Sequence, residues 1–309
     1  MGRDISAEEL TKTDSIHSAQ STHRYKRHSM FTFFRLNVML VSGSAVLLFI
    51  LILLIAAPIL FPHPNTGDLV ERLIPPVWMA RGSFRHIFGT DQLGRGIFSR
   101  TVWGGRISVL VGTVSSLMSM GIGMVLGIVS GYFRGKLDYA LARFADMLMA
   151  FPFLLFAIGM ISILGPGFMN SVLALSFKGW VEFYRLARSS VVEEHSKEYV
   201  EAAISIGASP FRIMASQILR NIWGPIFALW MLRIGTMIVL ESSLSFLGLG
   251  IQPPTPDWGR MISTGSDYLY NGYWISVLPG IALIGTVLTL NVVGEGLRAH
   301  FTNTHSTLS

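Results

Sequence analysis

The sequence predicts an all-helical integral membrane protein with six transmembrane helices. Its 309 residues are 51% hydrophobic and only 14% charged, and the mean hydropathy is +0.52. A soluble domain carries about 25% charged residues, so much of this chain has no need to face water. The apolar residues gather in runs long enough to cross a bilayer. These runs must be helical, because lipid offers no partners for open backbone groups.

Three uncharged runs give the first three spans, each near the roughly 20 residues that a bilayer requires. The first span covers 38–61 within the uncharged stretch 36–62. A cleaved signal peptide does not fit this run, because the run and the polar stretch before it are both too long. The second span covers 107–133, and the third covers 147–164. The third span ends at Gly165-Pro166-Gly167, which is a strong turn signal.

Charged residues enter two of the remaining three spans. The fourth span, 171–186, is interrupted three times, the fifth, 222–240, contains one arginine, and the sixth covers 274–294. The interrupting residues are Lys178, Glu182 and Arg185 in the fourth span and Arg233 in the fifth. Ionisable side chains at membrane depth indicate function, so Arg233 and Glu241, near the end of the fifth span, are candidates for a translocation path. Arg233 also fits a structural position at a subunit interface.

Basic residues set the orientation, since cytoplasmic loops carry an excess of lysine and arginine. With six spans, the basic groups before the first, between the second and third, between the fourth and fifth, and after the sixth share one side. Both termini are therefore expected in the cytoplasm, as tails over 1–35 and 297–309 that flank a core over 107–296. The segment 63–106, expected outside the cytoplasm, disagrees because it is also rich in arginine. Its arginines are Arg72, Arg81, Arg85, Arg95, Arg100 and Arg106.

Small residues recur every four positions along the second span. They are Ser115, Ser119, Gly123, Gly127 and Gly131. Small side chains at this spacing let two helix backbones approach closely in lipid. Gly123, Gly127 and Gly131 are therefore the expected helix-packing positions, against a helix of this chain or of another subunit.

The loop over 191–221 carries the most specific pattern outside the spans. Its middle holds good helix formers, and Gly207 then stops the helix. Ser209 can cap a second short helix that has a proline at its first position. The loop therefore predicts a helix, a tight turn and a second helix on the cytoplasmic side. Ala202 and Ala203 add little bulk to the first helix, which permits another surface to dock closely.

Two other interpretations fit the local pattern of this loop. A DNA-binding helix-turn-helix would look similar, but membrane spans hold both ends of the loop, and four glutamates would repel phosphates. Those residues are Glu193, Glu194, Glu198 and Glu201. A nucleic-acid partner is therefore not expected, while a merely solvated cytoplasmic loop stays open on physical grounds.

The loop also resembles the signature segment of a transporter family. Glu201-Ala202-Ala203, followed after three residues by Gly207 and Ala208, is similar to the EAA motif of binding-protein-dependent ABC permeases. Further stretches resemble the C-type permease subunit of dipeptide, oligopeptide and nickel importers. They are 88–95, 105–112, 241–250 and 252–259, together with Asn291 and 294–298. The resemblance extends over about 35–298 and is highly specific as an ordered set.

This resemblance implies a type I ABC importer permease fold and alternating-access transport of peptides or related small solutes in the bacterial inner membrane. In the family the EAA segment forms a coupling helix that sits in a groove of the cytoplasmic ATPase. By resemblance, the ATPase-coupling residues are Glu201, Ala202, Ala203, Gly207 and Ala208. The implied partners are a homologous second permease, two ABC ATPase domains and an extracytoplasmic solute-binding protein.

The sequence departs from the family pattern at three places. These departures do not change the predicted permease class, but the identity of the transported solute stays undetermined. Gly96 stands where an aspartate is usual, and Leu219-Arg220-Asn221 stands where Leu-Pro-Asn is usual. The usual Asp-Pro near the C-terminus is missing. Dipeptides, oligopeptides, nickel chelates and glutathione-like solutes all fit the family.

The sequence predicts no covalent chemistry in this chain. It lacks the G-x-x-x-x-G-K-[ST] phosphate loop, so ATP and Mg²⁺ are expected on the partner ATPase. There is no cysteine nucleophile, every histidine lies outside the predicted spans, and no cluster has metal-ligand spacing. An ion-coupled secondary transporter is the alternative, although such carriers place ionisable groups near the midplane and only Arg233 lies clearly inside a span.

Overall fold

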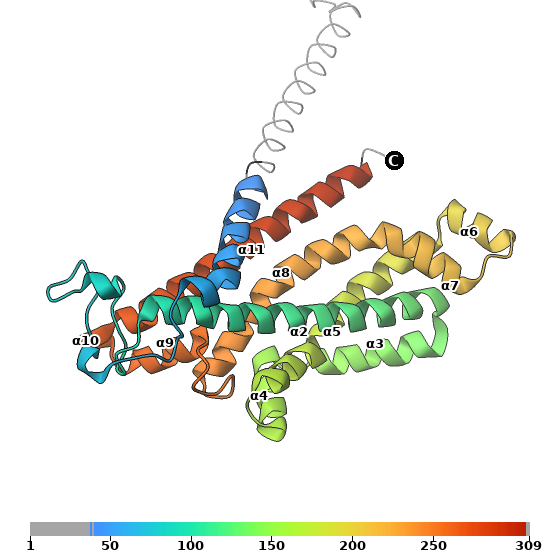
Figure 1. Cartoon of the computed structure of the whole chain (residues 1–309). Helices are drawn as coiled ribbons and strands as arrows, with labels where there is room; N and C mark the ends of the chain where they lie inside the picture. Colours follow the sequence, from blue (N-terminus) through green and yellow to red (C-terminus); the bar gives the residue numbers. More distant parts are fainter. Residues whose placement is uncertain (1–37, 39, 307–309) are drawn as a thin grey trace, which may run out of the picture.

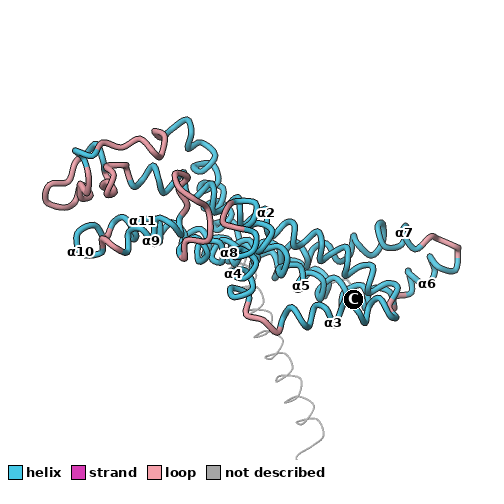
Figure 2. The backbone as a smooth tube through the Cα atoms, turned by 90° about the horizontal axis from the view of Figure 1, so that it is seen from below, coloured by secondary structure: helices cyan, strands magenta, loops and turns pink. Residues whose placement is uncertain are grey.

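The structure, a computed structural model, describes residues 38 and 40–306 and shows an elongated bundle of helices (Figure 1). A first helix, Leu40–Leu60, is followed by the short 3-10 helices Leu69–Glu71 and Phe84–His86. Figure 2 shows that the longest loops lie toward the end of the bundle that carries α10. The other elements are α2 (Ile97–Phe133), α3 (Gly135–Met149), α4 (Phe153–Leu164), α5 (Phe168–His195), α6 (Glu198–Ser205), α7 (Pro210–Arg212), a π-helical turn (Ile213–Ile218), α8 (Leu219–Phe246), α9 (Trp258–Ser266), α10 (Leu269–Gly272) and α11 (Trp274–Ser306).

The described part of the chain contains several helices fit to cross a membrane. Four are long and apolar enough by themselves: Leu40–Leu60, Ile97–Phe133, Pro210–Phe246 and Trp274–Phe301. The bent pair α3 and α4 gives a fifth candidate if it counts as one span. The 28 residues of α5 would reach about 42 Å, which is long enough, but six charged residues lower its apolarity. The all-helical membrane fold is confirmed, while the count of six spans stays a prediction.

The third span is not the continuous helix that its uncharged run predicts. The chain breaks between Met149 and Phe153, and α3 and α4 meet at 92°. Pro152 causes the break, because proline lacks an N–H group and disfavours the helical conformation of the residue before it. The Lys178 ammonium of α5 donates a hydrogen bond to the Phe151 carbonyl oxygen, which satisfies a backbone acceptor at the bend.

The second helix is longer than its uncharged run predicts. It begins at Ile97 rather than at position 107, so Arg100 and Arg106 lie within it. Gly96 precedes its first turn with extended backbone angles. Helix α2 therefore runs almost the whole length of the bundle in Figure 1.

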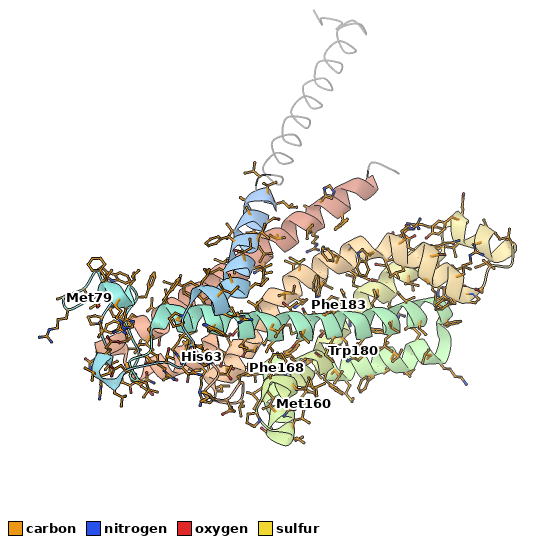
Figure 3. The ribbon with its side chains drawn as sticks, viewed as in Figure 1. His63, Met79, Met160, Phe168, Trp180 and Phe183 are labelled. Atoms are coloured by element: carbon orange, nitrogen blue, oxygen red, sulfur yellow. The ribbon has the colours of Figure 1, made fainter. Side chains whose placement is uncertain are left out.

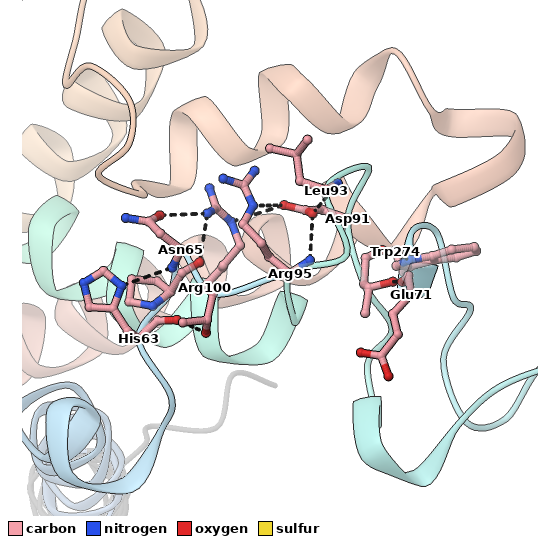
Figure 4. Close-up of polar contacts among 11 residues, drawn as sticks. His63, Asn65, Glu71, Asp91, Leu93, Arg95, Arg100 and Trp274 are labelled. Carbon is pink, nitrogen blue, oxygen red and sulfur yellow. Dashed lines mark hydrogen bonds and ion pairs between the residues drawn. The ribbon is translucent and has the colours of Figure 1, made fainter. Parts of the chain in front are cut away.

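Arg95 and Arg100 of the segment 63–106 form ion pairs with Asp91, and Arg100 also donates hydrogen bonds to carbonyl oxygens (Figure 4). Asp91 Oδ2 lies 2.7 Å from Arg95 Nε and 3.5 Å from Arg100 Nε. Arg100 Nη1 also donates to the Pro64 carbonyl oxygen at 3.1 Å and to Asn65 Oδ1 at 3.3 Å. These contacts bind the start of α2 to the segment that precedes it.

Two further arginines of this segment have partners. Arg85 Nη1 lies 2.6 Å from Glu71 Oε1, and the guanidinium of Arg106 lies 5.0 Å from the ring centre of Trp103. Paired arginines contribute less unbalanced positive charge than free ones. The positive-inside rule counts lysine and arginine with little regard to acidic residues, so this pairing does not remove the disagreement between the arginine content of 63–106 and its expected location outside the cytoplasm.

Helix α5 is the partner of the small-residue stripe on α2. A Cβ atom at Gly123 would lie 2.6 Å from Cβ of Phe183, which Figure 3 labels on α5. At Gly127 it would lie 2.7 Å from the Tyr184 carbonyl oxygen, and at Gly131 2.9 Å from the Arg188 carbonyl oxygen. These separations leave no room for a side chain. The stripe therefore packs within this chain, backbone against backbone.

Gly127→Leu should destabilise the bundle, because its side chain would force α2 and α5 apart. Overpacking of this kind costs about 1–3 kcal/mol. We expect a lower yield of monodisperse protein and a lower thermal midpoint in detergent. Gly121→Leu is the matched control, since Gly121 on the same helix has no atom within 4 Å of the Cβ position. Equal stability of the two variants would contradict the packing role of the stripe.

Candidate functional site

The loop between α5 and α8 forms a helix, a tight turn and a second helical segment, as the sequence predicts. Helix α6 ends in two backbone hydrogen bonds, from the Gly207 amide to the Ile204 carbonyl at 2.9 Å and from the Ala208 amide to the Ala203 carbonyl at 3.0 Å. This pattern requires a residue with positive φ at the turn, and Gly207 has φ +78. Ser209 then accepts a hydrogen bond from the Arg212 amide at 3.4 Å and caps α7.

The loop lies at the end of the bundle opposite α10 (Figures 1 and 2). Val200 and Ala203 on α6 are buried, with 0% and 5% of their surface exposed. They pack in a cluster of buried side chains from α5, the π-helical turn and α8. Its other members include Phe183, Ala187, Val191, Ile213, Ile218 and Ile222. The apolar face of α6 therefore binds the loop to the bundle.

The opposite face of the loop is open. Glu201 and Ala202 are exposed, and so are Ile206 at 85% and Phe211 at 77%. The two alanines of the signature thus lie on different sides. Only Ala202 is available to another surface, while Ala203 belongs to the core of this chain. The side chain of Ala203 is only 5% exposed, and the expectation that Ala203 takes part in ATPase coupling stays a prediction.

A buried carboxylate fixes the base of the loop. Glu194, in the last turn of α5, accepts hydrogen bonds from Lys197 Nζ and the Tyr199 hydroxyl. Asn221 Nδ2, in the first turn of α8, lies 2.9 Å from Glu194 Oε2 and 3.0 Å from the Tyr199 hydroxyl oxygen. One side chain therefore joins the end of α5, α6 and the start of α8.

Electrostatics keep this carboxylate ionised. Burial alone would raise the pKa of Glu194, but the hydrogen bonds from Lys197, Tyr199 and Asn221 outweigh it and hold that pKa below its usual range. Burial and the bond to Glu194 raise the pKa of Tyr199 to about 12, so the phenol keeps its proton and remains a donor. At neutral pH the carboxylate is therefore charged and the phenol is neutral.

The sequence did not single out Glu194 and Asn221 as a pair. The available signal was Asn221, which keeps the last position of the Leu-Pro-Asn pattern. Arg220, which replaces the proline, is exposed and takes part in none of these contacts. The departure at Arg220 therefore leaves the base of the loop intact.

A cavity of about 920 Å³ opens beside the loop, between α3, α5, α8 and α11. Its lining carries charges of both signs, including Glu182, Arg185 and Glu193. Arg233 on α8 forms an ion pair with Glu182 on α5, and about a third of its side chain is exposed. Glu182, the ion-pair partner of Arg233, is thus one of the residues that line this cavity. The role of Arg233 on a translocation path stays a prediction.

Glu241 occupies a different place. Its side chain is 0% exposed and receives hydrogen bonds from Ser245 Oγ at 2.8 Å and Ser242 Oγ at 3.4 Å. A solute could not reach it in this structure, and the placement of Glu241 on the translocation path stays a prediction. Within the described residues, no three His, Cys, Asp or Glu side chains gather in a group that could hold a metal ion.

Comparisons with known proteins agree with this architecture. Residues 123–304 match the family described as binding-protein-dependent transport system inner membrane component. The di/tripeptide transport system permease protein DppC of Pseudomonas aeruginosa is 35% identical over 257 residues, covering 83% of this chain and 85% of that protein. The dipeptide transport system permease protein DppC of Bacillus subtilis is 37% identical over 264 residues, covering 85% and 81%.

The fold has a counterpart among solved structures. Inward-facing MetNI, a methionine ABC transporter, contains a chain that aligns with a TM-score of 0.55 at 17% identity, covering 66% of this chain and 97% of its own. At that identity the likeness concerns the fold alone, and it is the fold of an ABC transporter permease. The chain therefore belongs to the family of binding-protein-dependent transport system inner membrane components, and it is an ABC transporter permease rather than an enzyme.

Proposed function

We propose that this chain is the permease subunit of an ATP-driven importer that moves dipeptides or short oligopeptides. The main support for this substrate class is the sequence identity of 32–37% to permeases named for dipeptide or di/tripeptide transport. The alignments cover 83–94% of this chain. A probable D,D-dipeptide permease of Escherichia coli is 32% identical across 94% of the chain. The family assignment removes the support for an ion-coupled secondary carrier.

The importer would contain a homologous second permease, two ABC ATPase domains and an extracytoplasmic solute-binding protein. The ATPases would bind ATP and Mg²⁺, since this sequence has no phosphate loop. The exposed face of the loop supports docking of an ATPase there. Ile206 and Phe211 are exposed beside Glu201 and Arg212, and large apolar side chains with a charged rim are typical of a protein interface.

Force from the ATPase would pass into the membrane through α8. Residues Pro210–Phe246 form one helical stretch of 37 residues, which begins directly after the turn at Gly207. The Glu194 cluster and the buried face of α6 attach the same turn to α5. A displacement of Glu201, Ala202, Gly207 or Ala208 would therefore move α5 and α8 together, and both helices border the large cavity.

Gly207→Val should uncouple ATP hydrolysis from transport while the protein stays in the membrane. A β-branched residue disfavours positive φ strongly, so the turn would distort and misplace the docking face. Gly207→Asn is the matched control, because asparagine tolerates this backbone conformation. In the reconstituted importer we expect loss of substrate-stimulated ATPase activity and uptake for the valine variant only. Wild-type uptake with wild-type stimulation by that variant would remove the coupling role of the loop.

Glu194→Gln should loosen the loop, because the ion pair with Lys197 is lost and one acceptor is replaced by a donor group. Losing a hydrogen bond to a buried charged group costs about 1.5–3 kcal/mol. We expect faster tryptic cleavage at Lys197 and Arg212 and a lower thermal midpoint. Glu193→Gln is the control, since the neighbouring Glu193 is exposed.

The pH dependence of this effect has a definite sign. The folded-state pKa of Glu194 is depressed, so its stabilisation is present above the ordinary carboxyl pKa of about 4.3 and is lost as the pH falls through the folded value. The difference in thermal midpoint between wild type and Glu194→Gln should thus be constant at neutral pH and shrink below about pH 4. A difference that persists undiminished in strong acid would contradict the electrostatic account.

Both termini would lie in the cytoplasm, with the segment 63–106 on the other side. The absence of cysteine makes this orientation testable by single-cysteine labelling. A membrane-impermeant maleimide applied to intact cells should label Thr66→Cys and should leave Leu308→Cys and Ser205→Cys unlabelled until the membrane is opened. Labelling of Thr66→Cys and Leu308→Cys from the same side would overturn the six-span arrangement.

A further inference from the structure

Three arginines line a small pocket at the end of the bundle away from α6 (Figure 1). The pocket lies between the start of α2, the loop before α9, α9 itself and the first residues of α11, and its volume is about 250 Å³. Arg95 and Arg100 line it from the side of α2, where Figure 4 shows them next to Asp91, and Arg260 lines it from α9. Three cationic side chains around one small hollow indicate a site for an anionic group.

Acidic groups of the chain compensate only part of this charge. Among the described residues Asp91 is the one acid that lines the pocket, and its Oδ2 lies 2.7 Å from Arg95 Nε and 3.5 Å from Arg100 Nε. Asp257, which caps α9, lies outside the lining, but its charge attracts both Arg260 and Arg100. Even with both acids ionised, three guanidinium groups face two carboxylates. One positive charge therefore remains uncompensated.

The arginines also keep hydrogen-bond donors free. Asp91 has little capacity left, because its Oδ1 accepts the amides of Leu93 at 2.8 Å and Arg95 at 3.0 Å, while its Oδ2 accepts Arg95 Nε. Within the described residues the Arg95 guanidinium donates only from Nε, and Arg260 donates only from its backbone amide, to Asp257. A guanidinium group is a planar fork that binds a carboxylate through two parallel hydrogen bonds. The Nη groups of Arg95 and Arg260 are therefore available to a carboxylate from outside the chain.

Apolar side chains form most of the remaining wall. They are Leu93, Ile97, Pro253, Pro254, Pro256, Met261 and Ile275. The pocket is smaller than the roughly 300–1,000 Å³ of sites for drug-sized ligands, so it suits the end of a small solute. Burial of an apolar side chain against this wall is favourable, whereas a phosphate ion has no apolar surface to bury. One net positive charge beside an apolar wall therefore matches the last residue of a peptide, which carries a single carboxylate and a side chain.

We propose that this pocket binds the C-terminal carboxylate of the peptide solute at the extracytoplasmic end of the permease. Arg260 and Arg95 would hold the carboxylate, Arg100 would add positive charge, and the proline loop together with Ile275 would cover the last side chain. The proposal rests on the proposed import of peptides and names a contact for them on this chain. It predicts that the permease itself distinguishes a peptide with a free C-terminus from one whose C-terminus is amidated.

Peptide binding to the assembled importer in lipid nanodiscs, without the solute-binding protein, tests the proposal directly. In a saturation-transfer NMR titration, alanyl-leucine should bind at least about tenfold more tightly than alanyl-leucinamide, because only the free carboxylate forms hydrogen bonds between charged groups. Arg260→Gln should abolish this preference. Arg72→Gln is the matched control, since Arg72 belongs to the same segment 63–106 but is exposed outside the pocket. Equal binding of the two peptides by the wild type would overturn the proposal.

Protection of an introduced cysteine locates the bound peptide without replacing any arginine, so it decides the question even if Arg260→Gln fails to fold. The chain has no native cysteine, and Thr264 lines the pocket. Alanyl-leucine, but not its amide, should slow maleimide labelling of Thr264→Cys and leave labelling of Thr66→Cys unchanged. Labelling of Thr264→Cys that ignores the peptide would contradict the proposal. Equal protection by inorganic phosphate, or protection by the solute-binding protein alone, would also overturn it, because the pocket would then hold any anion or an acidic side chain of that partner.

Uptake of alanyl-leucine by the complete importer, with its solute-binding protein, separates this pocket from the import function. Uptake together with equal binding of the two peptides would overturn the pocket and leave peptide import intact. Carboxylate-dependent binding without uptake of any peptide would overturn peptide import and leave a carboxylate site on the chain. Uptake together with carboxylate-dependent binding and protection of Thr264→Cys would support both.

Discussion

The close approach of α2 and α5 is the contact on which the rest of the structure depends. Gly123, Gly127 and Gly131 allow the two backbones to meet along the C-terminal turns of α2. Lipid gives no hydrophobic driving force between helices, so dispersion contacts at short range must hold them together. Helix α5 then carries Lys178, which binds the α3–α4 bend, and Glu194, which binds the loop. Both features would lose their support if α5 moved away.

Much of the fold could be predicted from the sequence because the physical rules involved are local. The apolar runs give the helices, and the turn at Gly207 follows from the one residue type that adopts positive φ without strain. The break at Pro152 was also local, but an uncharged run conceals it, since hydropathy does not register a missing N–H group. The start of α2 at Ile97 could not be predicted from the apolar run, because charged residues end the run before the helix ends. Arg100 and Arg106 interrupt the apolar pattern without interrupting the helix.

The functional residues that sequence reasoning missed are those whose partners are distant in the chain. Glu194 and Asn221 are 27 positions apart, so no spacing rule connects them. The arginines of 63–106 show the same limitation. Their number indicates one side of the membrane, but it does not show that Arg95 and Arg100 bind Asp91. Charge counts from sequence treat every arginine as free.

The opposite placement of Ala202 and Ala203 has a consequence for how this family can diverge. Position 203 is constrained by its own subunit, through neighbours such as Val191 and Ile213, and should change only together with them. Position 202 is exposed and would be constrained by the proposed ATPase, so it should change together with a different gene product. Two adjacent residues of one motif should therefore evolve under different constraints: Ala203 under those of this subunit's own fold, and Ala202 under those of the assembly. If a permease were exchanged between related transporters, the residue at position 203 should be kept, and the residue at position 202 should come under selection for the new partner.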